Sequence, residues 1–151
     1  MSNQPNESLL IPASGVFKNG IHEIAFRVYY ENTDMGGVVF YAEYLRWLER
    51  ARTEMLRQSN LNQIELYQEG LLFVVAELTI KYHKPALMDD VIVVKTQLLE
   101  KKNTFFVCEQ TIFRGSEKLL SAQVKVCSIN KLGKPCRMPL FNFHCTEKLK
   151  H

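Results

Sequence analysis

The amino-acid sequence predicts an α+β fold in which a single antiparallel sheet wraps around one long central helix. Residues 41–60 repeat their apolar side chains at steps of three and four, which is typical of a helix with one apolar face. Several other segments alternate apolar and polar side chains, as strands do. The loops between the later strands are short, which favours antiparallel pairing of neighbours.

The chain begins with a polar segment that contains prolines and glycines, and we expect residues 1–20 to form a flexible N-terminal arm. Residues 21–151 then form a single domain, which is an ordinary size for one core. The first predicted strand is "HEIAFRVYY" (residues 22–30), in which Ile24, Phe26 and Val28 share one side.

The long helix is predicted over "YAEYLRWLERARTEMLRQSN", and "LNQIELYQEG" predicts a second, short helix that ends at Gly70. The apolar face of the long helix comprises Tyr44, Leu45, Leu48, Ala51, Met55 and Leu56. Trp47 is expected in the core or in an interface.

Four strand segments follow the helices, and the chain after Arg137 is irregular. The segments are "LLFVVAELTIKYHKP", "DVIVVKTQLLE", "TFFVCEQTIFR" and "KLLSAQVKVCSIN". One helix is too small to cover such a sheet completely, and its edges stay open. We therefore expect the chain to associate with further copies of itself.

Charge and cysteine content exclude several classes of function. A net charge of +3 is too small to indicate a nucleic-acid partner. No secretory leader pattern and no apolar run of membrane-spanning length occurs, so we expect reduced thiols in the cytoplasm and no integral membrane protein. Cys136, His144 and Cys145 lie close in sequence, but their spacing fits no common zinc pattern, and no metal site is predicted.

The turn between the first strand and the long helix is the candidate site, because it holds Asp34 followed by Gly36 and Gly37. An Asp here commonly caps a helix or closes an Asx turn, and glycines commonly serve tight turns. The same residues also suit acyl transfer. A backbone amide near a helix start can stabilise charge on a carbonyl oxygen, and a carboxylate can attack the carbonyl carbon or activate a water.

The segment "RVYYENTDMGGVVFYAEYLRWLERARTEML" resembles the pattern of the YbgC-type acyl-CoA thioesterases, R-V-Y-Y-E-D-T-D-x-G-G-V-V-[YF]-[HY]-x-x-Y followed by E-R-A-R-T-E. These proteins form part of the 4-hydroxybenzoyl-CoA thioesterase branch of the hotdog superfamily. The resemblance continues through "VVAELTIKYHKPALMDDVIVV" and covers about residues 27–127. It implies a hotdog fold, homodimers or homotetramers, and hydrolysis of acyl-CoA thioesters without a cofactor, since CoA is part of the substrate.

The resemblance also implies roles for particular residues. Asp34 falls on the catalytic carboxylate, acting as nucleophile or general base, and Gly37 falls on the amide that polarises the thioester carbonyl. Asn32 replaces the first Asp of the family pattern. Tyr41 stands where many members have His, and it can serve the site as a hydrogen-bond donor or simply pack at the helix start.

A CoA thioester carries phosphates, so cations are expected at the mouth of the site. Lys101 and Lys102, in the turn "EKKN", are the candidates, with Arg114 and Lys134 as weaker ones; a solvated hairpin tip is the alternative. His83 is expected to be structural. Glu49 and Glu54 lie on the long helix, and we expect surface pairing with its arginines.

Two other functions remain open from the sequence. The first is a hotdog dehydratase acting on acyl thioesters, which needs a paired His and acid, and His83 is the only candidate. The second is a non-catalytic adaptor for acyl carrier protein or for phospholipid-synthesis enzymes. The family's genetic association with the Tol-Pal envelope system favours this adaptor, and it would place the protein at the periphery of the inner membrane.

Overall fold

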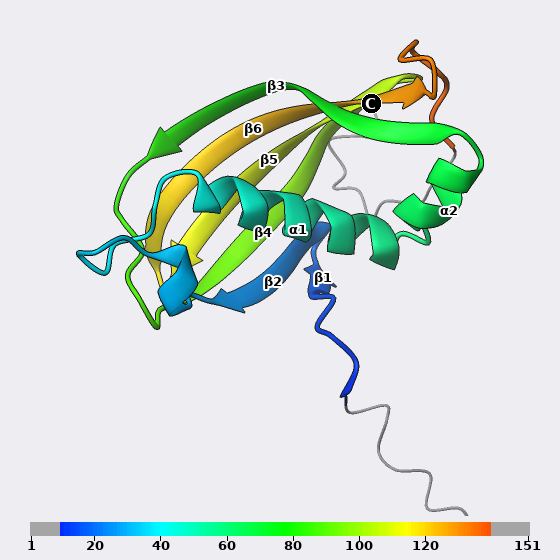
Figure 1. Cartoon of the computed structure of the whole chain (residues 1–151). Coiled ribbons are helices and arrows are strands. Elements are labelled where there is room, and N and C mark those ends of the chain that lie inside the picture. The colour runs from blue at the N-terminus through cyan, green and yellow to red at the C-terminus, as the bar shows by residue number, and fades with distance from the viewer. Residues whose placement is uncertain (1–9, 140–151) are drawn as a thin grey trace, which may run out of the picture.

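The computed structural model describes residues 10–139, and it contains one antiparallel sheet curved around one long helix (Figure 1). The sheet has six strands in the order β1-β2-β4-β5-β6-β3. The strands are β1 (Val16–Lys18), β2 (Ile21–Arg27), β3 (Leu71–Tyr82), β4 (Val91–Lys101), β5 (Phe105–Arg114) and β6 (Glu117–Asn130). The helices are the 3-10 helix η2 (Tyr30–Asn32), α1 (Glu43–Gln58) and α2 (Gln63–Gln68). The predicted fold class is confirmed.

Helix α1 forms the centre of the core because one of its faces is apolar along the whole length. Its buried side chains are Tyr44, Trp47, Leu48, Ala51, Met55 and Leu56. They belong to the same buried cluster as Ile92 of β4, Phe106 of β5 and Val124 of β6. The prediction placed Leu45 on this face, but this residue is 39% exposed. Trp47 lies in the core, which is one of the two places predicted for it.

Helix α2 follows α1 after a short connection and ends as the sequence predicted. The Asn62 side chain accepts hydrogen bonds from the amides of Ile64 and Glu65, which caps the first turn. Gly70 has a φ of +90°, a conformation that glycine adopts without steric cost. No helix among residues 10–139 is long and apolar enough to cross a membrane.

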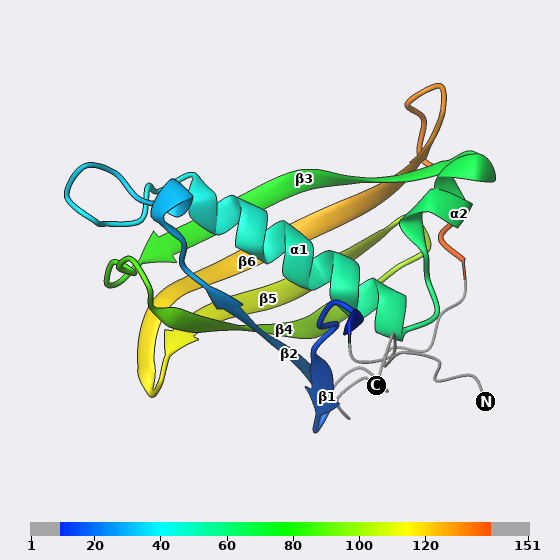
Figure 2. The same cartoon turned by 60° about the horizontal axis from the view of Figure 1, so that its bottom comes forward.

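Strand β3 forms one edge of the sheet, where only β6 pairs with it (Figure 2). Several of its apolar side chains are exposed, including Val75, Leu78 and Tyr82. The register against β6 shifts between Val75 and Glu77, so the alternation read from the sequence changes phase within the strand. An open edge with exposed apolar side chains is a surface suited to pairing with another chain.

Part of the segment predicted as a flexible N-terminal arm belongs to the sheet. Residues 16–18, which we expected to be part of a flexible arm, form β1 and pair with β2. The carbonyls of Ser14 and Gly15 accept hydrogen bonds from the Gln58 side chain at the end of α1. Gly15 has a φ of +74°, and a Cβ there would overlap the Glu23 carbonyl oxygen. The sequence alone could not show this docking, because it depends on contacts between distant segments.

The buried His22 makes the docked segment sensitive to pH. Its Nε2 lies 2.7 Å from the Ser14 carbonyl oxygen, and its Nδ1 has no partner in the described chain. Burial lowers the pKa of His22 below its ordinary value of 6.5, although hydrogen bonding to Ser14 and the charges of Glu54 and Glu23 oppose the shift. The unfolded chain therefore binds a proton more readily than the folded one, and stability falls as pH drops below about 6.5.

Thermal unfolding at pH 7.5 and pH 5.5 measures this effect. We expect a lower Tm at pH 5.5, and a smaller difference between the two pH values in His22→Gln, which cannot be protonated but can still donate to Ser14. An equal difference in the two proteins would contradict a role for His22.

Candidate active site

The loop that contains Asp34 is a tight hairpin that leads directly into α1. Thr33 and Val39 form a bridge at its base, and the Asp34 amide donates to the Val38 carbonyl at 2.9 Å. The Phe40 amide donates to the Asn32 carbonyl at 3.2 Å. These bonds fold the loop back on itself, so Asp34 and the start of α1 lie at the same end of the molecule (Figure 1).

The Asp34 carboxylate is exposed, and hydrogen bonds fix one of its two oxygens. Oδ1 accepts from the amides of Gly36 at 2.8 Å and Val38 at 3.2 Å. Oδ2 has no partner in the described chain. The Asx turn that we weighed as the structural explanation is thus present, and it also leaves one carboxylate oxygen oriented and accessible.

The amide of Gly37 is not placed as the sequence interpretation required. It donates to the Asp34 carbonyl at 3.0 Å, and it lies six residues ahead of Glu43, the first residue of α1. Gly37 has a φ of +76°, so the turn itself requires glycine here. The expectation that the Gly37 amide is a free helix-start donor is therefore wrong for this structure.

The free amides at the start of α1 belong to Tyr41 and Ala42. Neither has a hydrogen-bond acceptor within residues 10–139, and no side chain caps the helix at Ala42. The Tyr41 carbonyl is held by the Tyr82 hydroxyl at 3.0 Å, which fixes the orientation of the peptide that follows it. Uncapped amides at a helix start carry partial positive charge and suit an oxyanion.

The Tyr41 side chain lies at the surface, where its ring contacts that of Phe40 with 4.7 Å between centroids. Tyr41 also borders a groove beside the helix start, together with Val39, Tyr44, Tyr82, His83 and Lys84. His83 is paired in this groove, because its Nε2 lies 2.8 Å from Ser121 Oγ. No spacing of residues along the chain indicates this groove, because it forms only where β3 reaches the helix start.

Asn32 has a structural role that explains why it is not an aspartate. It is buried, its Oδ1 accepts from the Tyr29 amide at 2.7 Å, and its Nδ2 donates to Glu43 Oε2 at 3.2 Å. A carboxylate in this place would face the carboxylate of Glu43, and it would have no proton to donate.

We expect Asn32→Asp to destabilise the protein by about 1–3 kcal/mol at neutral pH, because a buried polar contact becomes a repulsive one. Urea unfolding measures the change. Glu43→Gln in the same chain supplies a new donor and should restore most of the stability. If the double variant is no more stable than Asn32→Asp alone, the contact between these two residues is not the cause.

A second loop, residues 85–90, packs against the hairpin and is hydrogen-bonded to it. The amides of Val39 and Met88 donate to the carbonyls of Ala86 and Gly37, each at 3.0 Å. The Ala86 amide donates to the buried Tyr44 hydroxyl at 2.9 Å. Arg114 anchors this loop through Asp90 at 2.7 Å and the Pro85 carbonyl at 3.2 Å.

The sequence suggested Arg114 as a weak candidate for binding phosphate. Hydrogen bonds to Asp90 and Glu117 raise the pKa of Arg114. Two carboxylates of the same chain therefore already balance its positive charge. Its guanidinium acts as a brace for the loop beneath the hairpin.

Lys101 and Lys102 lie far from Asp34 within one chain. They stand at the β4–β5 turn, at the opposite end of the sheet from Val91, where β4 begins beside Arg27 (Figure 1). Lys102 lies 3.8 Å from Glu100. The structure thus does not bring this pair to the candidate site of the same chain. Lys84 is the cation that borders the groove, and it pairs with Glu117 at 2.8 Å.

The family model described as "Thioesterase superfamily" matches residues 36–121, more than half of the chain. The chain belongs to the thioesterase superfamily. It is 42% identical to the Escherichia coli protein named "Acyl-CoA thioester hydrolase YbgC" over 115 residues, which cover 75% of this chain and 86% of that protein. It is 47% identical to "Acyl-CoA thioesterase YbgC" of Haemophilus influenzae over 109 residues, or 72% and 79% of the two chains.

A solved structure described as a probable thioesterase from Bartonella henselae superposes on this thioesterase with a TM-score of 0.76 at 36% identity. The superposition covers 79% of this chain and 99% of that one. The predicted hotdog fold and the resemblance to YbgC-type thioesterases are confirmed.

Among residues 10–139, no group of three or more His, Cys, Asp or Glu side chains gathers as metal ligands do. The three cysteines in this range, Cys108, Cys127 and Cys136, are free thiols. Burial raises the pKa of the Cys108 thiol to about 12, so this thiol is not a nucleophile near neutral pH. His144 and Cys145 lie outside the described residues.

Proposed function

We propose that this thioesterase hydrolyses acyl-CoA thioesters to a free acid and CoA, with Asp34 as the catalytic carboxylate. The observation that carries the proposal concerns two groups at the same end of the molecule. One is the oriented, accessible carboxylate of Asp34, and the other is the uncapped start of α1. The names of the YbgC relatives, which are acyl-CoA thioester hydrolases, support the substrate class.

In the proposed reaction the amides of Tyr41 and Ala42 donate to the thioester oxygen, where negative charge develops. In one route Oδ2 of Asp34 attacks the carbonyl carbon, the C–S bond breaks to release CoA thiolate, and water then cleaves the mixed anhydride to give the free acid and a proton for the thiolate. In the other route Oδ2 removes a proton from a water that attacks the carbonyl carbon, the C–S bond breaks, and this proton passes to the departing CoA sulfur. The groove beside Tyr41, Tyr82 and Lys84 is the proposed path for the CoA arm.

The measurement that tests this function is thiol release from a panel of acyl-CoAs, from short aliphatic to long-chain and including 4-hydroxybenzoyl-CoA. We expect hydrolysis of at least one member of the panel. Hydration of an enoyl thioester, assayed in parallel, tests the dehydratase alternative. If no thioester is cleaved, the proposed function is wrong, and the adaptor for acyl carrier protein becomes the better explanation.

We also propose that the working form is a homodimer or homotetramer, because β3 presents an open edge with exposed apolar side chains. Light scattering should give a mass of at least two chains. Leu78→Lys on β3 should shift the mass toward one chain, whereas Val16→Lys, on the opposite edge strand, should not. Equal behaviour of the two variants would rule out β3 as the interface.

A further inference from the structure

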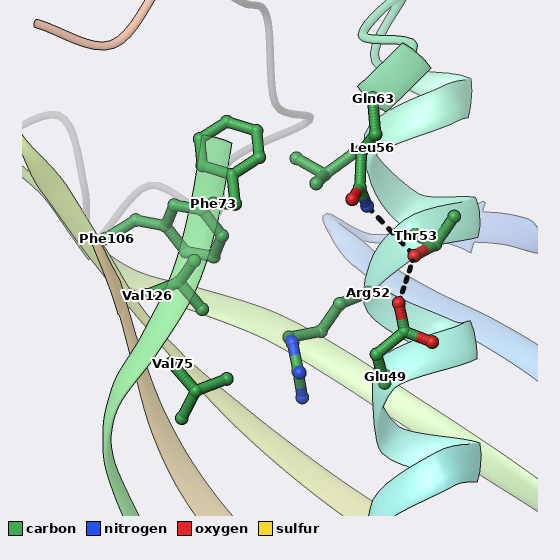
Figure 3. A pocket seen from close by; sticks show the side chains of 9 residues that line it. All are labelled: Glu49, Arg52, Thr53, Leu56, Gln63, Phe73, Val75, Phe106 and Val126. Atoms are coloured by element: carbon green, nitrogen blue, oxygen red, sulfur yellow. Dashed lines mark hydrogen bonds between the residues drawn. The ribbon is translucent and has the colours of Figure 1, made fainter. Parts of the chain in front are cut away.

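A pocket between α1 and β3 combines an apolar floor with a polar rim (Figure 3). Phe73, Phe106 and Val126 belong to the apolar part, and Leu56 and Val75 complete it. Glu49 and Arg52 are the charged side chains of the rim. The pocket lies along α1, downstream of the candidate active site at the start of that helix.

Arg52 is a half-buried cation that forms no ion pair within 4 Å among the described residues. Its Nη1 donates to Gln110 Oε1 at 3.0 Å, and no carboxylate lies within 4 Å of it in the described chain. Burial lowers the pKa of Arg52, although the nearby charge of Glu49 opposes the shift. The Arg52 side chain extends from α1 into the space between that helix and β3, where it lines the pocket (Figure 3).

Glu49 supplies an acceptor on the other side of the pocket. Its Oε1 accepts from Thr53 Oγ1 at 2.9 Å, and Thr53 Oγ1 accepts in turn from Gln63 Nε2 at 2.9 Å. No Lys or Arg side chain in the described part of the chain lies within 4 Å of Glu49, so the predicted pairing with helix arginines is not a direct ion pair; the charge of Glu49 still acts on Arg52, whose pKa it raises. Glu54, by contrast, pairs with Arg57 at 3.1 Å.

We propose that this pocket binds the acyl part of the substrate and selects an acyl group that carries a hydroxyl. The inference rests on the proposed function. A hydroxyl both donates and accepts, so it satisfies Glu49 and Arg52 together. A carboxylate would be repelled by Glu49. A methyl group would remove water from both charges and offer no hydrogen bond to either one.

The position of the pocket along α1 sets the length of the acyl chain. Glu49 and Arg52 follow Ala42 by seven and ten residues, which correspond to roughly 10–15 Å along the helix axis. A thioester carbonyl held at the helix start therefore needs an extended chain to place a hydroxyl between these side chains. The expected substrate class is a medium-chain hydroxyacyl thioester with its hydroxyl near the far end. A ring attached directly to the carbonyl is too short.

Two pairs of thioesters test the proposal: decanoyl-CoA with 10-hydroxydecanoyl-CoA, and benzoyl-CoA with 4-hydroxybenzoyl-CoA. We expect kcat/KM to be about tenfold or more higher for 10-hydroxydecanoyl-CoA than for decanoyl-CoA, which is the size of one hydrogen bond to a charged group. The benzoyl pair should show no such preference. A preference confined to the benzoyl pair would overturn the assignment of chain length, and no preference in either pair would overturn the proposal.

Variants locate the preference in the pocket. Glu49→Ala and Arg52→Met should abolish the preference, so that the ratio of kcat/KM between 10-hydroxydecanoyl-CoA and decanoyl-CoA falls to about one. Arg50→Met serves as the control, because Arg50 is exposed on the same helix and does not line this pocket, so the preference should persist. Arg52 also donates a hydrogen bond to the buried Gln110, so Arg52→Met can destabilise the fold. If that variant does not fold, Glu49→Ala decides the outcome. An unchanged preference in Glu49→Ala would contradict the proposal.

Calorimetric binding of non-hydrolysable thioether analogues separates this proposal from the proposed function. If the protein cleaves no thioester but binds the hydroxydecyl thioether about tenfold more tightly than the decyl thioether, the proposed hydrolytic function is wrong, whereas the selection of a hydroxyl by the pocket is supported. If hydrolysis occurs and the two thioethers bind equally, the function stands and the selection of a hydroxyl is wrong.

Discussion

Asp34→Asn is expected to lower kcat for thioester hydrolysis by about 10²-fold or more, because it removes the only group proposed to attack the carbonyl or activate water. The substitution preserves shape. The Asn Oδ1 can still accept from the amides of Gly36 and Val38, so the hairpin should keep its conformation. Thiol release under saturating and limiting substrate separates kcat from KM, and we expect the loss to lie in kcat.

The matched control is Asp89→Asn. Asp89 lies in the loop that braces the hairpin, its side chain is 83% exposed, and among the described residues it pairs only with Arg27, at 3.5 Å. Its φ of +69° is one that Asn tolerates well. This variant removes the same charge from the same end of the molecule, and it should retain most of the activity. If both variants lose activity equally, the net charge at this end matters, and Asp34 has no special role.

The fold was predictable because its signals are local. Strand alternation, the helical spacing of Leu48, Ala51 and Met55, and the glycine that ends α2 each depend on only a few neighbouring residues. The errors arose where tertiary packing decides. Leu45 lies outside the core, and residues 16–18 joined the sheet because Gln58 and His22 hold the preceding segment.

The candidate site was predictable as a segment and less so in its details. The position of Asp34 before a glycine pair can be read from the sequence, but the hydrogen bonds that occupy the Gly37 amide depend on how the hairpin closes. The acceptor-free amides lie only four and five residues further on. The spacing of residues in the sequence cannot distinguish these amides from that of Gly37, because tertiary packing determines at which residue the helix begins.

The pocket between α1 and β3 was not predictable at all. Glu49 and Arg52 are three residues apart on a charged helix, and that spacing normally indicates an ion pair at the surface. The Arg52 guanidinium instead donates to Gln110, a buried side chain on β5, and it forms no ion pair with Glu49 within 4 Å. A polar residue in the middle of a strand was the available signal, and its partner could not be known before the fold.

Ala42→Pro is expected to lower kcat by about 10²–10³-fold, because proline lacks the N–H proposed to stabilise the oxyanion. The backbone at Ala42 has a φ of −74°, which the proline ring adopts, and proline is tolerated at helix starts because no intrahelical bond is lost there. Ala42→Ser keeps the N–H in the same backbone and should remain active. The ratio of kcat between these two variants isolates the amide from the side chain.

Proline also restricts the residue before it, so the fold of Ala42→Pro must be verified by circular dichroism and thermal unfolding. A folded proline variant with full activity would show that the Ala42 amide does not polarise the thioester. An independent measurement uses the wild-type chain: the amide NMR signals of Tyr41 and Ala42 should shift when a non-hydrolysable ketone analogue of the substrate binds. If the analogue binds and leaves both signals in place, the carbonyl lies elsewhere, and the uncapped start of α1 has no part in the reaction.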